Sequence, residues 1–397
     1  MSNLRQVKLQ ISQAMPELLG LIRGDLPRFV YSNRELGNEV PVFSFHSVSP
    51  SGFRCLLDYL ATNGYATISM DDMYRHLSGA KPLTGRNIVL TFDDGWSTAW
   101  SVATPLLKEF NMQATLYIAP ATISEENGLR KTIEDGVSEE VALREDGKHI
   151  GYLITLQELD AMQSSGVWDI QSHTLYHTRV WKNNNVVDFV NPSLEKTLIN
   201  YRPWYYMISN ASDVLSPYDL QLGWPIYPDT ARMIGTQRYI PHNNEGAMLV
   251  KYVSENGGNK YFQANNWRKL LKNYLMEYRK KNPGRWETRE EVLESIRHEL
   301  YESRKILQQR TNSVVSHLLF PWEEGSMTAI KIAKEIGYKT ASWGVLRNRR
   351  SNSPGDDPFN IPRISWKFIP LLPGKGRTSL LQELQHRVRK RTRALFT

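Results

Sequence analysis

From Val40 onward, short apolar runs alternate with segments whose hydrophobic residues recur at helical spacing. One run, Asn87-Ile-Val-Leu-Thr-Phe92, is almost wholly apolar, as expected of a strand buried on both faces of a parallel sheet. Repeated strand and helix units of this kind fold into α/β sheets or barrels. The alternation lapses after His177, where turn-forming and aromatic residues dominate, and resumes at Thr288. We therefore expect one α/β domain interrupted by a long insertion.

These changes of pattern divide the chain into four parts. They are an N-terminal helical extension (1–39), an α/β domain (40–177 and 288–370), an aromatic-rich insertion (178–287) and a basic C-terminal helical tail (371–397). The hydrophobic content of 41% is sufficient for a packed core. Cys55 is the single cysteine, so no internal disulfide forms, and its apolar neighbours predict that it is buried on a helix.

The sequence also bears on location and partners. It has neither a signal-peptide pattern nor a run of about 18 apolar residues that would span a membrane, which favours a cytoplasmic location. The net charge of +8 suggests an acidic partner. No nucleic-acid-binding motif accompanies this charge, so nucleic acid is not an expected partner.

Two adjacent carboxylates, Asp93 and Asp94, follow the buried run within Thr91-Phe-Asp-Asp-Gly-Trp96. Functional loops of parallel sheets and barrels leave from the carboxyl ends of the strands. Successive side chains at a strand end point in different directions, so one carboxylate can bind a metal ion while the other accepts a proton. The structural alternative is an Asp-Gly turn that caps the next helix.

Two histidines, His173 and His177, follow another predicted strand, Trp168-Asp-Ile-Gln171. If the segment forms one helical turn, both imidazoles lie on the same face and can bind one ion. Taken alone, two histidines at this spacing are more often surface or packing residues than metal ligands. Together with Asp94, the pair would make a three-ligand site with open coordination positions, which is what catalysis requires.

In this order, the two motifs resemble those of the polysaccharide deacetylases that share the NodB homology domain. TFDDGW at 91–96 is similar to the first family motif and SHTLYH at 172–177 to the second. The likeness extends to a first strand at 42–46 and to a third motif at Phe320-Pro-Trp322, and it covers about 40–177 and 288–345. The resemblance implies a distorted (β/α) barrel of the polysaccharide deacetylase type, here with a long insertion.

The resemblance also implies an activity and a set of roles. The chain would be a hydrolase that removes an N-acetyl group from an acetamido sugar in a glycan or a lipid-linked glycan precursor. Asp93 would be the catalytic base, and Asp94, His173 and His177 would bind Zn²⁺ or another divalent metal ion. A backbone N–H near Trp322 would bind the oxyanion.

Two features depart from the family pattern. Many members have an arginine that orients the catalytic aspartate where this chain has Leu319, and the candidate substitute is Arg363, for which a structural surface position is the alternative. The general acid is also open. Candidates are His386 in the tail and His46 at the end of the first strand, whereas Glu323 and Glu324 are more simply explained as exposed residues before the next helix.

Two other functions remain compatible with these residues. Two histidines and one carboxylate also describe non-haem iron enzymes, although those usually carry the triad on an all-β scaffold. A non-catalytic carbohydrate-binding relative would explain the missing third-motif arginine, although binding alone has little need of Asp93.

The insertion and the tail suggest contacts with partners. The insertion is rich in tryptophan and tyrosine, which either stack on sugar rings or build a small core of their own. Its tryptophans are Trp181, Trp204, Trp224, Trp267 and Trp286. The tail from Leu380 is a basic, leucine-bearing helix that either docks on the barrel or contacts an anionic membrane, which would place the protein peripherally at the inner membrane surface.

Overall fold

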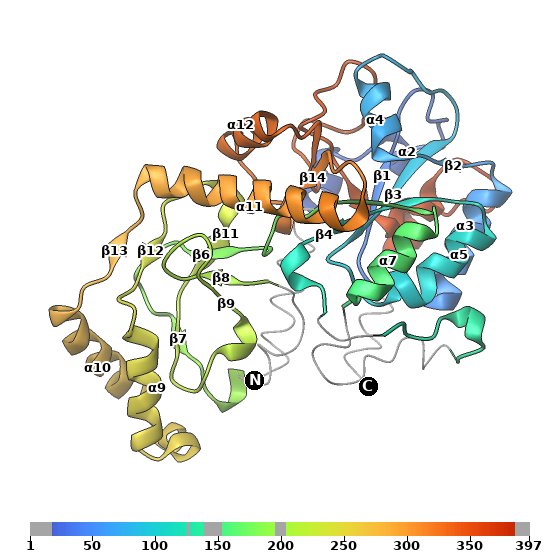
Figure 1. Ribbon diagram of the computed structural model, residues 1–397. Helices are drawn as coiled ribbons and strands as arrows, with labels where there is room; N and C mark the ends of the chain where they lie inside the picture. Colours follow the sequence, from blue (N-terminus) through green and yellow to red (C-terminus); the bar gives the residue numbers. More distant parts are fainter. Residues whose placement is uncertain (1–17, 125–127, 139–152, 195–203, 386–397) are drawn as a thin grey trace.

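The computed structural model describes residues 18–124, 128–138, 153–194 and 204–385. Figure 1 shows two lobes, a barrel with surrounding helices and a second lobe made by the segment between His177 and Thr288. Helix α11 (Arg289–Thr311) runs from the second lobe onto the barrel. Within the described residues, no helix is both long and apolar enough to span a membrane.

The barrel is built from one wholly parallel sheet. Its strands are β1 (Val42–Phe45), β2 (Ala66–Thr67), β3 (Asn87–Asp93), β4 (Ala114–Ile118), β5 (Trp168–Ser172), β14 (His317–Leu319), β15 (Thr340–Ser342) and β16 (Ile364–Ser365). They lie in the order β15-β14-β5-β4-β3-β1-β16, with β2 beside β3. A parallel bridge between Ser342 of β15 and Ile361, just before β16, closes the sheet on itself. The expected distorted (β/α) barrel is confirmed.

Alternation along β3 decides which side chains face the barrel interior. Phe92 packs outward into the main core, where its ring stacks on Phe45 of β1 at 4.9 Å between centroids. Val89 belongs instead to a smaller cluster with Tyr117 and Leu319. Because side chains alternate with a period of two, Asp93 shares the face of Val89 and points into the interior.

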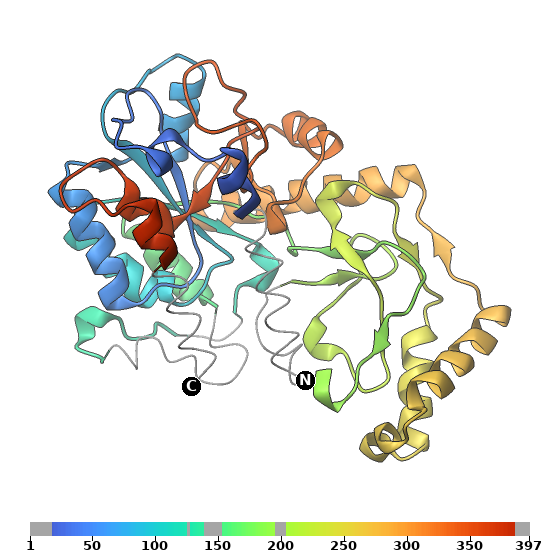
Figure 2. The same ribbon diagram turned by 180° about the vertical axis from the view of Figure 1, so that it is seen from behind.

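Helices surround the sheet. They are α2 (Arg28–Tyr31), α3 (Pro50–Thr62), α4 (Met70–Leu77), α5 (Thr104–Glu109), α7 (Leu156–Ser164), α11 and α12 (Met327–Ile336). Most pack on its outer face, whereas α4 contributes Met70 and Met73 to the smaller cluster that includes Val89. Capping boxes begin two of the helices, with Thr155 and Glu158 at α7 and with Thr288 and Glu291 at α11. Figure 2 shows the segment after β16 (red) beside the first elements of the barrel (blue). Here the Trp366 ring stacks on the ring of Phe45 in β1.

Two sequence expectations need correction. Cys55 is exposed, because it lies about 200° around α3 from Phe53, and the buried stripe of Phe53, Leu56 and Leu60 faces the other way. The largely apolar run at 314–320 predicts a strand of that length, but the strand covers only His317–Leu319. It starts late because the side-chain oxygen of Gln171 accepts the backbone N–H of Ser316 and His317, each at 2.9 Å.

The second lobe has its own small sheets and two apolar clusters. Its strands are β6 (Arg179–Trp181), β7 (Asp188–Phe189), β8 (Tyr206–Met207), β9 (Val214–Leu215), β10 (Pro225–Ile226), β11 (Asp229–Ala231), β12 (Tyr239–Ile240) and β13 (Arg285–Trp286), and its helices are α9 (Glu245–Glu255) and α10 (Trp267–Lys281). Trp181 and Trp267 are buried in the two clusters, so these aromatics do build a core, whereas Trp286 is half exposed.

Candidate metal centre

Asp94, His173 and His177 converge at the carboxyl ends of β3 and β5. One ligand atom from each lies within 4.8 Å of the others. Asp94 Oδ1 is 3.4 Å from His173 Nε2 and 3.5 Å from His177 Nε2. All three residues are buried. The structure therefore brings together the three side chains that the sequence singled out as metal ligands.

The chain turns sharply at Asp94, directly after Asp93 ends β3. Asp94 has φ 68° and Gly95 has φ 74°, so the chain turns sharply as it leaves β3. The Asp94 N–H donates to the Tyr117 carbonyl at 3.0 Å, which fixes this turn on β4. The left-handed φ of Gly95, together with a Cβ position only 2.6 Å from Ile118 Cδ1, favours glycine here. The turn directs Asp94 toward the histidines while Asp93 stays in the barrel interior.

Nε2 of both histidines faces Asp94. His173 Nδ1 lies 2.9 Å from the Leu319 carbonyl, which can only accept, so Nδ1 donates to this carbonyl and the ring is oriented with Nε2 toward Asp94. Burial, followed by repulsion from His173, lowers the pKa of His177 to about 3. Two imidazole nitrogens and one carboxylate oxygen thus face a common point, and this donor set fits a divalent cation.

The loop between the histidines is not the helical turn considered from their spacing. Thr174 and His177 both have left-handed backbone angles, φ 64° and φ 53°. The carboxylate of Glu299, on α11, accepts the backbone N–H of Leu175 at 3.0 Å and of Tyr176 at 3.1 Å. These bonds take the place of helical ones and hold the loop open.

Asp93 forms a buried ion pair with Arg363. The guanidinium donates to Asp93 Oδ1 at 2.7 Å and to Oδ2 at 2.9 Å, and it also donates to Thr91 Oγ1 at 2.9 Å. Asp93 is 4% exposed and Arg363 is 2% exposed, so the surface alternative for this arginine is wrong. Arg363 therefore supplies the partner for Asp93 that Leu319 cannot.

His46 lies at the rim beside both aspartates. Its Nε2 is 3.7 Å from Asp94 Oδ2 and 4.0 Å from Asp93 Oδ2, and 59% of its side chain is exposed. Glu324 is engaged elsewhere, since its carboxylate accepts the Ala231 N–H at 3.3 Å. His386 lies outside the described residues.

Aromatic and cationic side chains form one wall of the centre. Trp322, with φ 61°, places its ring 4.8 Å from that of His177. The Arg179 guanidinium lies 4.6 Å from the centre of the Trp322 ring. The ring of Trp204, in the insertion, also packs on Trp322, with 5.4 Å between the ring centroids. Trp204 of the insertion therefore packs against Trp322, which itself contacts His177, whereas Trp181 and Trp267 serve the core of the insertion.

Glu299 is not among the residues that the sequence motifs single out. The sequence does hold a clue to this residue. Glu299 is a charged residue on the apolar face of α11, in line with Val292, Ile296 and Ser303, and a glutamate on a buried face needs a buried role.

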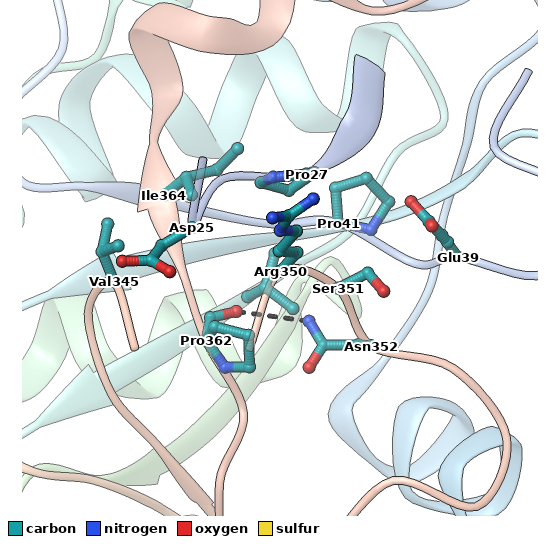
Figure 3. A pocket seen from close by; sticks show the side chains of 11 residues that line it. Asp25, Pro27, Glu39, Pro41, Val345, Arg350, Ser351, Asn352, Pro362 and Ile364 are labelled. Carbon is teal, nitrogen blue, oxygen red and sulfur yellow. Dashed lines mark hydrogen bonds between the residues drawn. The ribbon is translucent and has the colours of Figure 1, made fainter. Parts of the chain in front are cut away.

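A cavity lies elsewhere, beside the start of β1. Figure 3 shows Arg350 between Pro27 and Pro41 there, with the Asn352 amide donating to the Pro362 carbonyl at 3.2 Å. None of the metal-site residues lines this cavity. It is therefore separate from the candidate metal centre.

Comparison with known proteins agrees with the motifs. The polysaccharide deacetylase family model matches residues 80–196. The poly-beta-1,6-N-acetyl-D-glucosamine N-deacetylase of Escherichia coli (strain K12) is 30% identical over 130 residues, which are 33% of this chain and 18% of that protein. The protein of the same name from Staphylococcus aureus (strain MRSA252) is 26% identical over 163 residues, 40% of this chain and 46% of that protein.

Among solved structures, the BpsB deacetylase domain from Bordetella bronchiseptica aligns with 84% of this chain and 97% of its own, with 16% identity and a TM-score of 0.48. The chain spans less than half the length of the curated relatives named above. The matched segment contains both the Asp93-Asp94 motif and the two histidines. Over residues 80–196, the chain is therefore similar to the polysaccharide deacetylases.

Proposed function

We propose that this protein is a metal-dependent hydrolase that removes the N-acetyl group from an acetamido sugar. The observation that carries the proposal is the cluster of Asp94, His173 and His177 beside the buried pair of Asp93 and Arg363. A carbohydrate-binding module needs no second carboxylate held in place by a buried arginine. The wholly parallel barrel also differs from the all-β scaffold usual for the non-haem iron alternative.

Hydrolysis of an acetamide needs an activated water and a protonated leaving nitrogen. A divalent cation in this centre would polarise the acetamide carbonyl and make a water molecule more acidic. Asp93 accepts the proton of that water as the oxygen bonds to the carbonyl carbon. Arg363 holds both carboxylate oxygens, so it fixes the orientation in which Asp93 receives the proton.

Among the residues that the structure describes, His46 is best placed to protonate the leaving nitrogen. It lies on the rim, on the solvent side of both aspartates, so its imidazole can reach a sugar amide that enters from outside. When the C–N bond breaks, His46 donates a proton to the nitrogen and acetate leaves with the new oxygen. We therefore place His46 ahead of His386 as the general acid.

The substrate class follows from the relatives and from the wall of the centre. The relatives from Escherichia coli and Staphylococcus aureus are named for poly-β-1,6-N-acetyl-D-glucosamine, so a β-linked N-acetylglucosamine polymer is the first substrate to test. Trp322, which contacts His177, and its neighbour Trp204 are both partly exposed, which supports a carbohydrate ligand.

Acetate release from N-acetylglucosamine oligomers, with and without added Zn²⁺, tests this proposal. The wild type should release acetate in a metal-dependent manner, and Asp93→Asn should retain metal while losing about 10²–10⁴-fold in turnover. Sugar binding without acetate release would instead support a binding module, and oxygen-dependent turnover with bound iron would support an iron enzyme.

A location at the inner membrane surface is a further part of the proposal. Five basic residues crowd positions 387–393, and each can contribute about 1 kcal/mol at an anionic surface. This part of the tail lies outside the described residues, so the support comes from the sequence alone. A peripheral protein would meet acetamido sugars on lipid-linked precursors.

A further inference from the structure

Glu299 is a fully buried carboxylate that accepts hydrogen bonds from the loop that carries the histidine ligands. It is 0% exposed and lies on α11. Oε2 accepts the N–H groups of Leu175 and Tyr176, and Oε1 accepts the hydroxyl of Thr178. Three donors from one short loop therefore converge on a single side chain.

No lysine or arginine in the described ranges forms an ion pair with Glu299. An unpaired buried carboxylate is costly, and burial raises the pKa of Glu299, although its three donors offset part of that effect. An apolar side chain at this position would make a better core for α11. A glutamate at position 299 is therefore better explained by the loop that its carboxylate holds in place than by its contribution to packing.

The loop needs such an anchor because its backbone is strained. Thr174 is β-branched, and a β-branched residue rarely adopts a left-handed conformation such as its φ of 64°. His177 is also left-handed, with φ 53°. Without an acceptor, the buried N–H of Leu175 would lose its hydrogen bond and the loop would relax.

Helix α11 fixes the loop at a second point. Ser303, one turn after Glu299, lies with its hydroxyl 2.8 Å from that of Ser172, the residue before His173. Ser172 in turn accepts the Thr174 N–H at 3.3 Å. Both ends of the loop are thus tied to the helix that follows the insertion in sequence.

We infer that Glu299 is a positioning residue that holds the loop 174–178 so that Nε2 of both histidines faces Asp94. The inference rests on the proposed metal site. Because Thr178 leads directly into β6, the same carboxylate also links the insertion to the metal ligands. Glu299 touches neither the ligand atoms nor a substrate, so its effect is on the geometry and affinity of the site.

Cobalt(II) binding to the full chain tests this role without reference to turnover. Affinity is measured by competition with a chelator, and ligand geometry by the visible d–d absorption of the saturated protein. Glu299→Ala should bind Co²⁺ about 10–100-fold more weakly and show an altered spectrum at saturation. Glu299→Gln should restore most of the affinity, because its oxygen can accept both backbone N–H groups.

The matched control is Glu294→Ala, an exposed glutamate on the same helix, which should bind Co²⁺ like the wild type. If Glu299→Ala does not fold, Glu299→Asp replaces it, because a carboxylate one methylene shorter cannot reach all three donors. Circular dichroism checks that each variant is folded.

The outcomes separate this inference from the proposed function. Wild-type affinity and spectrum in folded Glu299→Ala or Glu299→Asp overturn the inference and leave the metal site standing. Failure of the wild type to bind Co²⁺ overturns the proposed metal site and, with it, the inference.

Discussion

Replacing Arg363 with methionine leaves Asp93 buried without its ionic partner. The wild-type pair is held by two bonds to the carboxylate, and both residues are almost inaccessible to solvent. Removing one member of such a pair costs about 3–5 kcal/mol, because the remaining charge stays buried. That loss is a large part of the roughly 5–15 kcal/mol that holds a typical domain folded.

The double variant Asp93→Asn with Arg363→Met separates this effect from lost packing. With both charges gone, no uncompensated charge remains, so the double variant should be more stable than Arg363→Met alone. Arg54→Met is the matched control. Arg54 pairs with Glu109 at the surface, where both side chains are about half exposed, so its loss should cost less than about 1 kcal/mol.

Urea unfolding followed by tryptophan fluorescence gives the free energy of unfolding for each variant, and acetate release gives turnover. Misplaced Asp93 should lower the turnover of folded Arg363→Met by about 10²-fold while metal content is kept. The reasoning is refuted if Arg363→Met is as stable as the wild type, or if removing the second charge makes the protein less stable still.

Three further predictions follow from the site and the tail. His46→Gln should lose about 10²–10⁴-fold in acetate release with unchanged metal content, and normal turnover would place the general acid elsewhere. The pKa of His177 is lowered from 6.5 to about 3, so as the pH falls this histidine is protonated in the unfolded chain before it is protonated in the folded protein. The free energy of unfolding of the metal-free protein should therefore fall as the pH drops from 6.5 toward 3. His177→Asn should make this fall shallower, and an equal slope in both proteins would contradict the prediction. Deleting 386–397 should abolish salt-sensitive binding to anionic vesicles, and equal binding by both chains would remove the membrane role.

The barrel was predictable because each strand carries its own signal. The run before Asp93 is almost wholly apolar, and a buried parallel strand of this kind directs whatever follows it to the functional edge. The same logic placed His173 beyond β5. Agreement between local pattern and global fold is why the sequence could place Asp94 and the two histidines, the proposed metal ligands, at one edge of the barrel.

The contacts that orient these residues were not predictable in the same way. The bond from Arg363 to Asp93 depends on closure of the barrel, which joins positions 270 apart in the sequence. The left-handed loop at Thr174 depends on Glu299, which is separated from it by the whole insertion. Helical spacing alone therefore gave the wrong local conformation for the pair of histidines.

The central claim is that Asp94, His173 and His177 form one divalent metal site. Elemental analysis of the wild type and of the double variant His173→Ala with His177→Ala, after equilibration with Zn²⁺ and removal of loosely bound ions, tests it most directly. The account predicts one ion per chain in the wild type and none in the folded double variant, with acetate release lost together with the metal. Full metal occupancy in the double variant would contradict it.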